Sequence, residues 1–192
     1  DGPIDSFSLV TRDFGKILPN PTQELIAGSE GCVHELFSEQ ARRTPDQVAV
    51  ADPHESLSYA DLDRQSNQLA NCLIAHDIKP HDVVAIFGHR SAALVWAMLG
   101  ILKAGAAFLI LDPRYPGSRL TEYLRIVKPR GLLHILPAGD LPTALGEFIG
   151  QQEIRCRLEL GPRPDAAMKE HSTNAPQVHV NTTDLAYVTF TS

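Results

Sequence analysis

The 192-residue sequence lacks the features that mark membrane, secreted or nucleic-acid-binding proteins. No uncharged apolar run reaches the roughly 18 residues of a transmembrane helix, and the longest candidate, residues 92–105, contains Lys103. The first residues have neither the positive start nor the apolar middle of a signal peptide. The net charge is -6 and basic runs are absent. We therefore expect a cytoplasmic protein without nucleic-acid or membrane partners.

Cysteine is scarce, and no metal or nucleotide signature of a common type is present. Cys32, Cys72 and Cys156 are far apart and form no CxxC pair, which favours buried, reduced thiols. The eight histidines show no ligand spacing with one another or with the cysteines, so we assign no metal ligand. Neither the dinucleotide-binding motif G-x-G-x-x-G nor the Walker loop occurs, so the sequence gives no sign of either type of nucleotide site.

Helical and strand patterns alternate from Cys32 onward. Residues 1–30 carry three prolines and no sustained periodicity, and we interpret them as a lead-in or linker. A helical pattern follows and must end before Pro45. The apolar alternation of residues 48–50, with residues 57–59 as partner, predicts a β-hairpin.

A long helix is predicted to begin at Ser58, because Ser58 and Asp61 have the spacing of a capping box. Its apolar stripe is expected to contain Leu62, Leu69, Leu73 and Ile74. The polar residues expected to face water are Asp63, Arg64, Gln65 and Asn67. This helix should end between Asp77 and Pro80.

The following segment predicts a βαβ unit. Residues 83–88 are almost entirely apolar, as is typical of a strand buried on both faces. A helix over 91–104, ended by Gly105, leads to a second apolar strand at 106–112. Lys103 lies in the last turn of that helix, where a cation suits the helix dipole, and we assign it a structural role.

The remaining elements continue the alternation. Helices are predicted at 118–127 and 141–149, strands at 131–136, 153–160 and 185–190, and a mobile surface connection at 161–184. The pattern predicts an α/β fold with an open, mostly parallel sheet and helices on both faces. Ligands in such sheets bind beyond the carboxyl ends of the strands.

Four parts of the sequence carry a family resemblance. They are TPDQVAVAD with LSYADLDRQSNQLA, then IKPHDVVAIFGHRS, then LKAGAAFLILDPRYPGSRL, and finally LAYVTFTS. Their order and spacing resemble the front half of amino-acid adenylation domains of non-ribosomal peptide synthetases and of the related acyl-CoA synthetase and luciferase superfamily. The resemblance implies that residues 31–192 are the N-terminal part of an AMP-binding domain, within its large sub-domain and cut off at the phosphate loop.

A narrower resemblance is to the α-aminoadipate reductases of fungal lysine synthesis, which join adenylation, thiolation and reductase domains. It rests on LPNPTQEL, DPRYPGSR, and VKPRGLLHI followed by AGDL. The resemblance implies adenylation of an amino-acid carboxylate with ATP and Mg²⁺, transfer to a phosphopantetheine thiol, and reduction by NADPH to an aldehyde. The implied partners are the amino-acid or other carboxylic-acid substrate, a carrier domain and the remainder of the adenylation domain.

In this family the FTS strand end opens into a Ser/Thr/Gly-rich loop around the β- and γ-phosphates of ATP. The resemblance therefore assigns ATP-phosphate contacts to Thr191 and Ser192, and assigns no catalytic residue. Because the family places its other site residues after this point, we expect these 192 residues alone to be inactive and to expose an apolar face. The alternatives are a peptide-forming synthetase, an acyl-CoA synthetase for a free acid, and a non-catalytic interaction module with the same fold.

Overall fold

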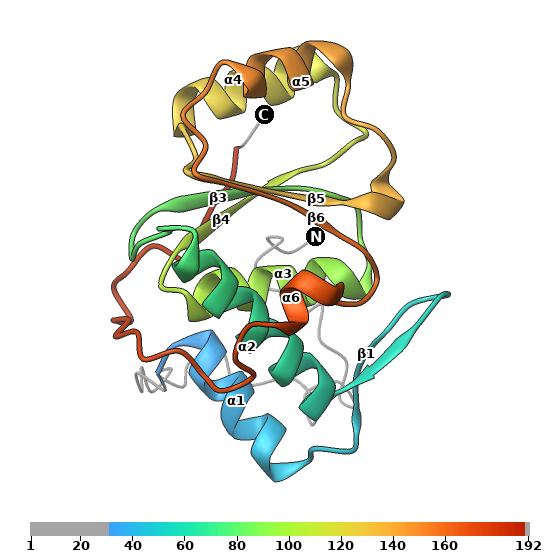
Figure 1. Cartoon of the computed structure of the whole chain (residues 1–192), viewed down its shortest axis with the longest axis vertical. Coiled ribbons are helices and arrows are strands. Elements are labelled where there is room, and N and C mark those ends of the chain that lie inside the picture. Colours follow the sequence, from blue (N-terminus) through green and yellow to red (C-terminus); the bar gives the residue numbers. More distant parts are fainter. Residues whose placement is uncertain (1–30, 191–192) are drawn as a thin grey trace, which may run out of the picture. The chain divides into compact units, whose positions relative to one another are not determined.

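A parallel sheet of five strands separates two layers of helices in the computed structural model, which describes residues 31–190 (Figure 1). The strand order is β6-β5-β3-β4-β7, and every neighbouring pair is parallel. The strands are β3 (Val83–Phe87), β4 (Ala107–Leu111), β5 (Gly131–Ile135), β6 (Cys156–Leu160) and β7 (Tyr187–Val188). The predicted open α/β sheet is confirmed. The predicted lead-in 1–30 lies outside the described residues.

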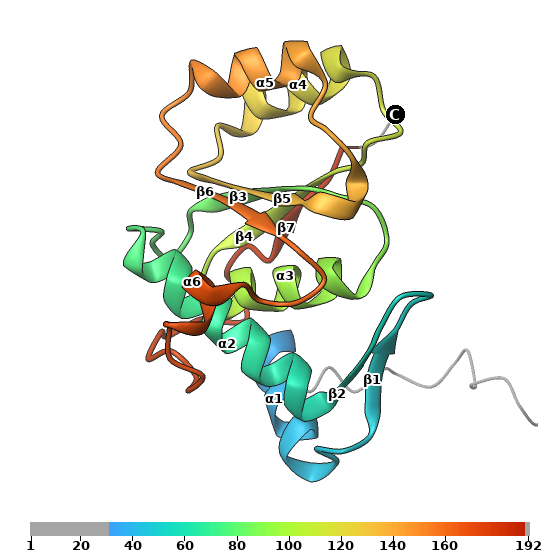
Figure 2. The ribbon, with the colours of Figure 1, turned by 45° about the vertical axis from the view of Figure 1, so that its right-hand side comes forward.

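Helices cover both faces of the sheet, as Figure 2 shows. One layer contains α1 (Val33–Arg43), α2 (Tyr59–Ala75), α3 (Ala92–Lys103) and the short α6 (Ala166–Lys169). The other contains α4 (Gly117–Val127) and α5 (Thr143–Gly150). The 3-10 turn η3 (Leu136–Ala138) follows β5, and the strands β1 (Val48–Ala51) and β2 (Ser56–Ser58) form a separate antiparallel hairpin.

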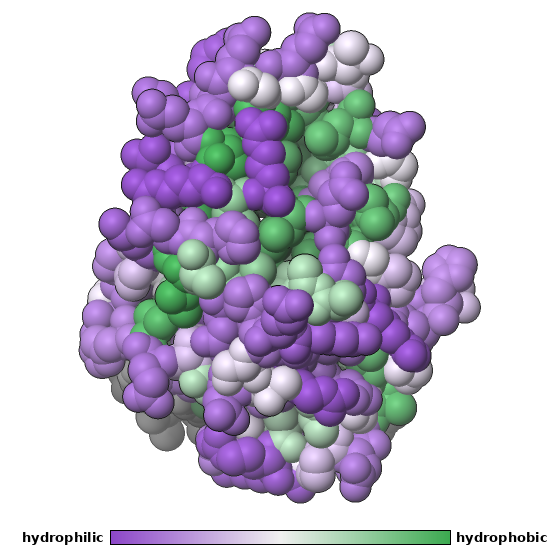
Figure 3. Space-filling view, viewed as in Figure 1, coloured by the Kyte–Doolittle hydropathy of each residue, from purple (hydrophilic) through white to green (hydrophobic). Residues whose placement is uncertain are grey.

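The core lies on both faces of β3, whose residues from Val84 to Phe87 are at most 1% exposed. A central strand of a parallel sheet is covered by helices on both faces, which explains why every residue of β3 is apolar. Hydrophobic side chains are visible where the α4 and α5 layer meets the sheet (Figure 3). On the other face α3 packs tightly on α2, since a Cβ at Gly100 would lie 2.7 Å from Leu69 Cδ2. The backbone at Gly105 has φ +76°, which confirms the predicted glycine stop after α3.

The cap of α2 matches the sequence prediction, whereas its polar face does not. Ser58 Oγ accepts a hydrogen bond from the Asp61 amide at 3.1 Å and donates one to Asp61 Oδ2 at 2.8 Å. However, Gln65 and Asn67 are only 7% and 3% exposed, while Ile74 of the expected apolar stripe is 38% exposed. The prediction that Gln65 and Asn67 face water is therefore wrong.

The connection between β6 and β7 covers this polar face. Asn67 Nδ2 donates to the Thr173 carbonyl at 2.9 Å. Asn71 Nδ2 donates to the carbonyls of Ser172 and Asn174, each at 2.9 Å. The side-chain amides of α2 thus satisfy backbone groups of a segment without regular structure. The predicted connection at 161–184 contains the short helix α6 and is bonded to α2 at residues 172–174, while its mobility stays a prediction.

Lys103 lies at the centre of the contact between α2 and α3. Its Nζ donates to Asp63 Oδ1 at 2.7 Å, Ser66 Oγ at 2.8 Å and Asn67 Oδ1 at 2.7 Å. The side chain is 3% exposed, and Nζ also lies 5.6 Å from the centre of the Phe37 ring. Burial lowers the Lys103 pKa, and the Asp63 carboxylate opposes that shift. Lys103 lies in the last turn of α3, as predicted, and its ammonium group also forms a buried ion pair with Asp63.

We predict that Lys103→Met lowers the free energy of unfolding by about 3 kcal/mol, because it leaves the acceptors of α2 without their donor. Urea unfolding at neutral pH would measure this loss. Lys79→Met is the matched control, since Lys79 is 63% exposed and 3.4 Å from Asp77, and such a pair contributes at most about 1 kcal/mol. Equal, small effects of the two substitutions would contradict the assigned role.

Candidate functional site

The predicted phosphate-contacting residues follow β7, the edge strand of the sheet. Tyr187 and Val188 pair with Phe108 and Leu109 of β4 in a parallel register. The chain after β7 therefore runs toward the carboxyl edge of the sheet, where ligands of open α/β sheets bind. Thr191 and Ser192 themselves lie outside the described residues, so their contact with ATP stays a prediction.

An open hollow of about 330 Å³ lies beside β4 and β7. It is lined mainly by aromatic and aliphatic side chains, among them Phe108, Ile110, Tyr115, Tyr123, Tyr187 and Phe190. Ile110, Leu185 and Tyr187 are 38%, 55% and 57% exposed, which is high for large apolar side chains. This edge therefore carries the kind of exposed apolar surface that the sequence predicted.

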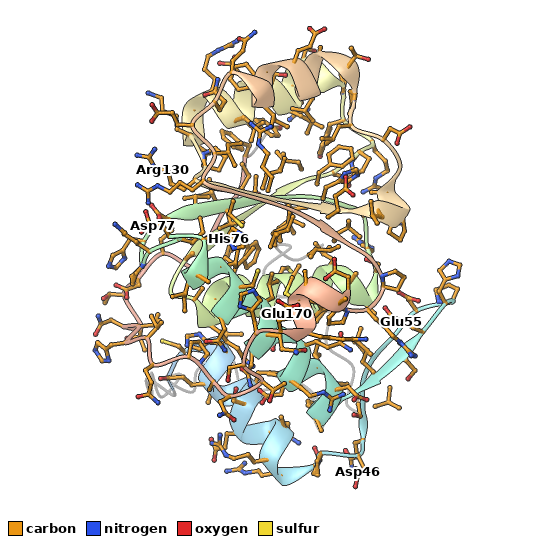
Figure 4. All side chains as sticks on the ribbon, in the orientation of Figure 1. Asp46, Glu55, His76, Asp77, Arg130 and Glu170 are labelled. Carbon is orange, nitrogen blue, oxygen red and sulfur yellow. The ribbon has the colours of Figure 1, made fainter. Side chains whose placement is uncertain are left out.

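A second hollow, of about 520 Å³, lies between the β1–β2 hairpin and the carboxyl ends of β3, β5 and β6. Its polar lining includes Glu55, His89 and Arg90. Figure 4 shows Glu55 on the hairpin, at the opposite end of the sheet from Asp77 and Arg130. The Glu55 side chain is 5% exposed, with Oε2 3.8 Å from Arg163 Nε, and burial raises the pKa of Glu55.

Asp52 joins the hairpin to the start of α3. Its Oδ2 accepts a hydrogen bond from the Ala92 amide at 2.8 Å, and its Oδ1 accepts from the amides of His54 and Glu55 at 2.8 and 3.0 Å. The bond from Ala92 is the largest cause of the lowered Asp52 pKa. The sequence predicts only a chain reversal here. An aspartate at this position is a known turn signal, because its carboxylate accepts hydrogen bonds from backbone amides that follow it. We assign Asp52 the positioning of the hairpin.

We predict that Asp52→Asn lowers the melting temperature at pH 7 and that the difference disappears in acid. The folded-state pKa is below the unfolded one, so this stabilisation is present above about pH 4 and is lost as the pH falls through the folded pKa. Thermal melts between about pH 2 and pH 7 would show it. Asp46→Asn, at an exposed position on the loop before β1 (Figure 4), is the matched control for the charge change. A pH-independent difference for Asp52→Asn would contradict the interpretation.

The cysteines and the acidic residues and histidines show no metal site within residues 31–190. Cys72 and Cys156 are buried free thiols, and burial raises the pKa of Cys72 to about 11 and of Cys156 to about 12. Cys32 is free but only half-buried, which corrects the prediction that all three are buried. In this described range, no group of three His, Cys, Asp or Glu side chains could hold a metal ion. Nor is any helix of the same range long and apolar enough to cross a membrane.

Comparison with known protein families shows which family this chain belongs to. The profile of the AMP-binding enzyme family matches residues 37–192. This match covers most of the sequence, in the region of the sheet and both helix layers. The chain therefore belongs to the AMP-binding enzyme family, within the superfamily that contains the non-ribosomal peptide synthetases.

The chain is similar in sequence to an aminoadipate reductase and to a peptide synthetase. The L-2-aminoadipate reductase of Saccharomyces cerevisiae is 38% identical over 164 residues, covering 81% of this chain and 12% of the reductase. A linear gramicidin synthase of Brevibacillus parabrevis is 38% identical over 200 residues, covering 100% of this chain and 2% of the synthase. Both resemblances expected from the sequence are confirmed. The chain spans only a small part of the length of these relatives.

Solved structures agree on the fold. The non-ribosomal peptide synthetase FmoA3 in its AMPPNP-bound form superposes with a TM-score of 0.70 at 28% identity, covering 90% of this chain and 17% of that one. A fatty acyl CoA synthetase of Mycobacterium tuberculosis gives a TM-score of 0.70 at 18% identity, covering 83% of this chain and 32% of that one. The second likeness shows the fold alone.

Proposed function

We propose that residues 31–192 are the N-terminal part of an adenylation domain, preceded by a linker at 1–30, in an enzyme that activates and reduces an amino-acid carboxylate. The observation that supports this most directly is the 38% identity to an L-2-aminoadipate reductase. The proposed cofactors are ATP and Mg²⁺ in this domain, with a phosphopantetheine carrier and NADPH elsewhere in the protein. We also propose a cytoplasmic location for the enzyme.

The proposed reaction has two steps in which this domain takes part. A carboxylate oxygen attacks the α-phosphorus of ATP, the bond to the β-phosphate oxygen breaks, and an acyl adenylate and pyrophosphate form. A carrier thiol then attacks the acyl carbon, loses its proton and displaces AMP, which gives a thioester. NADPH, when bound to a reductase domain, supplies the hydride that releases the aldehyde. Both steps in this domain require positioning and charge neutralisation more than a protein nucleophile.

The role of this chain in that chemistry is to bring the phosphate-binding segment to the sheet edge. Strand β7 pairs with β4, and the chain up to Phe190 runs toward the carboxyl ends of the strands. Thr191 and Ser192 are proposed to offer hydroxyl and amide groups to the β- and γ-phosphates. We propose no catalytic residue within 31–190, and we expect the isolated chain to be inactive.

A peptide-forming synthetase is the second candidate, because the linear gramicidin synthase is equally identical over the whole chain. The two candidates share adenylation and thioester formation and differ only in the fate of the thioester. An acyl-CoA synthetase has weaker support, since the fatty acyl CoA synthetase likeness is at 18% identity. A non-catalytic interaction module would bind no nucleotide.

We predict that the full-length protein catalyses acid-dependent exchange of labelled pyrophosphate into ATP, and that the 192-residue chain alone does not. A panel of amino acids including α-aminoadipate would identify the preferred acid. With that acid and the phosphopantetheinylated enzyme, oxidation of NADPH with formation of an aldehyde would support the reductase, and its absence would favour the peptide synthetase. No exchange with any acid by the folded protein would contradict an adenylating function.

A further inference from the structure

We propose that Tyr123 on α4 is a positioning residue for the ATP-phosphate segment, acting through Phe190. The proposal rests on the proposed function, because Phe190 directly precedes Thr191 and Ser192 in the sequence. Tyr123 is thus assigned no contact with the reacting atoms. Its role is to fix the direction in which the chain leaves β7.

The contact between the two rings has close, parallel geometry. The ring centres of Tyr123 and Phe190 are 4.0 Å apart, and the ring planes differ by 3°. Both side chains are partly buried against the core cluster that contains Leu120 and Leu124. Parallel stacking with an offset is one of the two arrangements that aromatic pairs favour, and such a pair contributes stability beyond the apolar area that it buries.

The contact between Tyr123 and Phe190 lies where the pairing of β7 with β4 has ended. The register of β4 with β7 ends at Leu109 and Val188, so Phe190 lies two residues beyond the last paired position. As β7 contains only two residues and forms the edge of the sheet, the ladder alone restrains the following chain weakly. The stack on Tyr123 provides a side-chain restraint at the position where the backbone restraint is lost.

Arg119 in turn holds Tyr123 in place. Arg119 Nε donates a hydrogen bond to Tyr123 Oη, and the guanidinium lies 4.7 Å from the centre of the Tyr115 ring. The guanidinium also lies 5.6 Å from the centre of the Tyr123 ring, so Arg119 contacts both tyrosines. Tyr115, Arg119 and Tyr123 recur at intervals of four, which places them along one side of the helix and the turn before it.

The test compares three substitutions in the full-length protein. Tyr123→Leu removes the stack, and Tyr123→Phe keeps the stack while removing the hydroxyl. Tyr59→Leu is the matched control, because Tyr59 stacks on Phe37 with ring centres 5.7 Å apart, on the opposite face of the sheet from α4. The measurements are KM for ATP and for the preferred acid in pyrophosphate exchange, Kd for AMPPNP by calorimetry, and the melting temperature.

We expect Tyr123→Leu to raise KM for ATP and Kd for AMPPNP between about threefold and about tenfold, the change that one aromatic pair supplies. KM for the acid should stay within about twofold. Tyr123→Phe keeps the stack but loses the hydrogen bond from Arg119, so its Kd for AMPPNP should lie between those of the wild type and Tyr123→Leu. Tyr59→Leu should lower the melting temperature and leave both KM values unchanged. Equal effects of Tyr123→Leu and Tyr59→Leu on ATP binding would overturn the proposal.

The two proposals fail in distinguishable ways. If the wild-type protein shows no exchange but binds AMPPNP, the proposed adenylation fails, and the ratio of Kd values still decides the role of Tyr123. If the wild type shows exchange but Tyr123→Leu binds AMPPNP normally, the positioning role alone is overturned. A wild-type protein that neither exchanges nor binds AMPPNP would overturn both.

Discussion

The ion pair between Lys103 and Asp63 is the interaction on which one face of this structure depends. The ammonium group joins α3 to α2 by satisfying Asp63, Ser66 and Asn67 together. Asn67 also donates to the Thr173 carbonyl, in the segment that leads to β7. Lys103 thus joins α3, α2 and the connection that precedes β7 in one hydrogen-bond network.

The fold was largely predictable because its main signals are local. Apolar strands, the Ser58 and Asp61 cap and the glycine stop at Gly105 each depend on neighbouring residues. The polar face of α2 was not predictable in this way. Gln65 lies three residues after Leu62 and four before Leu69, so the helical spacing places it on the apolar side despite its polarity. Asn67 lies away from that side, and partners more than 30 residues away in sequence bury it. The sequence shows that a side chain is polar but does not show which residue will form a hydrogen bond with it.

The sequence predicts the candidate site at the end of β7, and the contact of Thr191 and Ser192 with ATP stays a prediction. The sequence of β7 indicates a strand that leads to Thr191 and Ser192, and the parallel pairing with β4 brings that strand to the sheet edge. The stack of Tyr123 on Phe190 was missed, because it joins residues 67 positions apart. The only local signal was the four-residue spacing of Tyr115, Arg119 and Tyr123. This long-range contact packs α4 against the residue that precedes Thr191 and Ser192.

The most direct test of the central claim, that the carboxyl edge at β7 is the nucleotide-binding edge, is a crystal structure of the full-length protein with AMPPNP and Mg²⁺. We expect β- and γ-phosphate oxygens within hydrogen-bond distance of Thr191 and Ser192, with Phe190 still stacked on Tyr123. Triphosphate bound instead in the hollow beside the β1–β2 hairpin, next to Arg90, would contradict it.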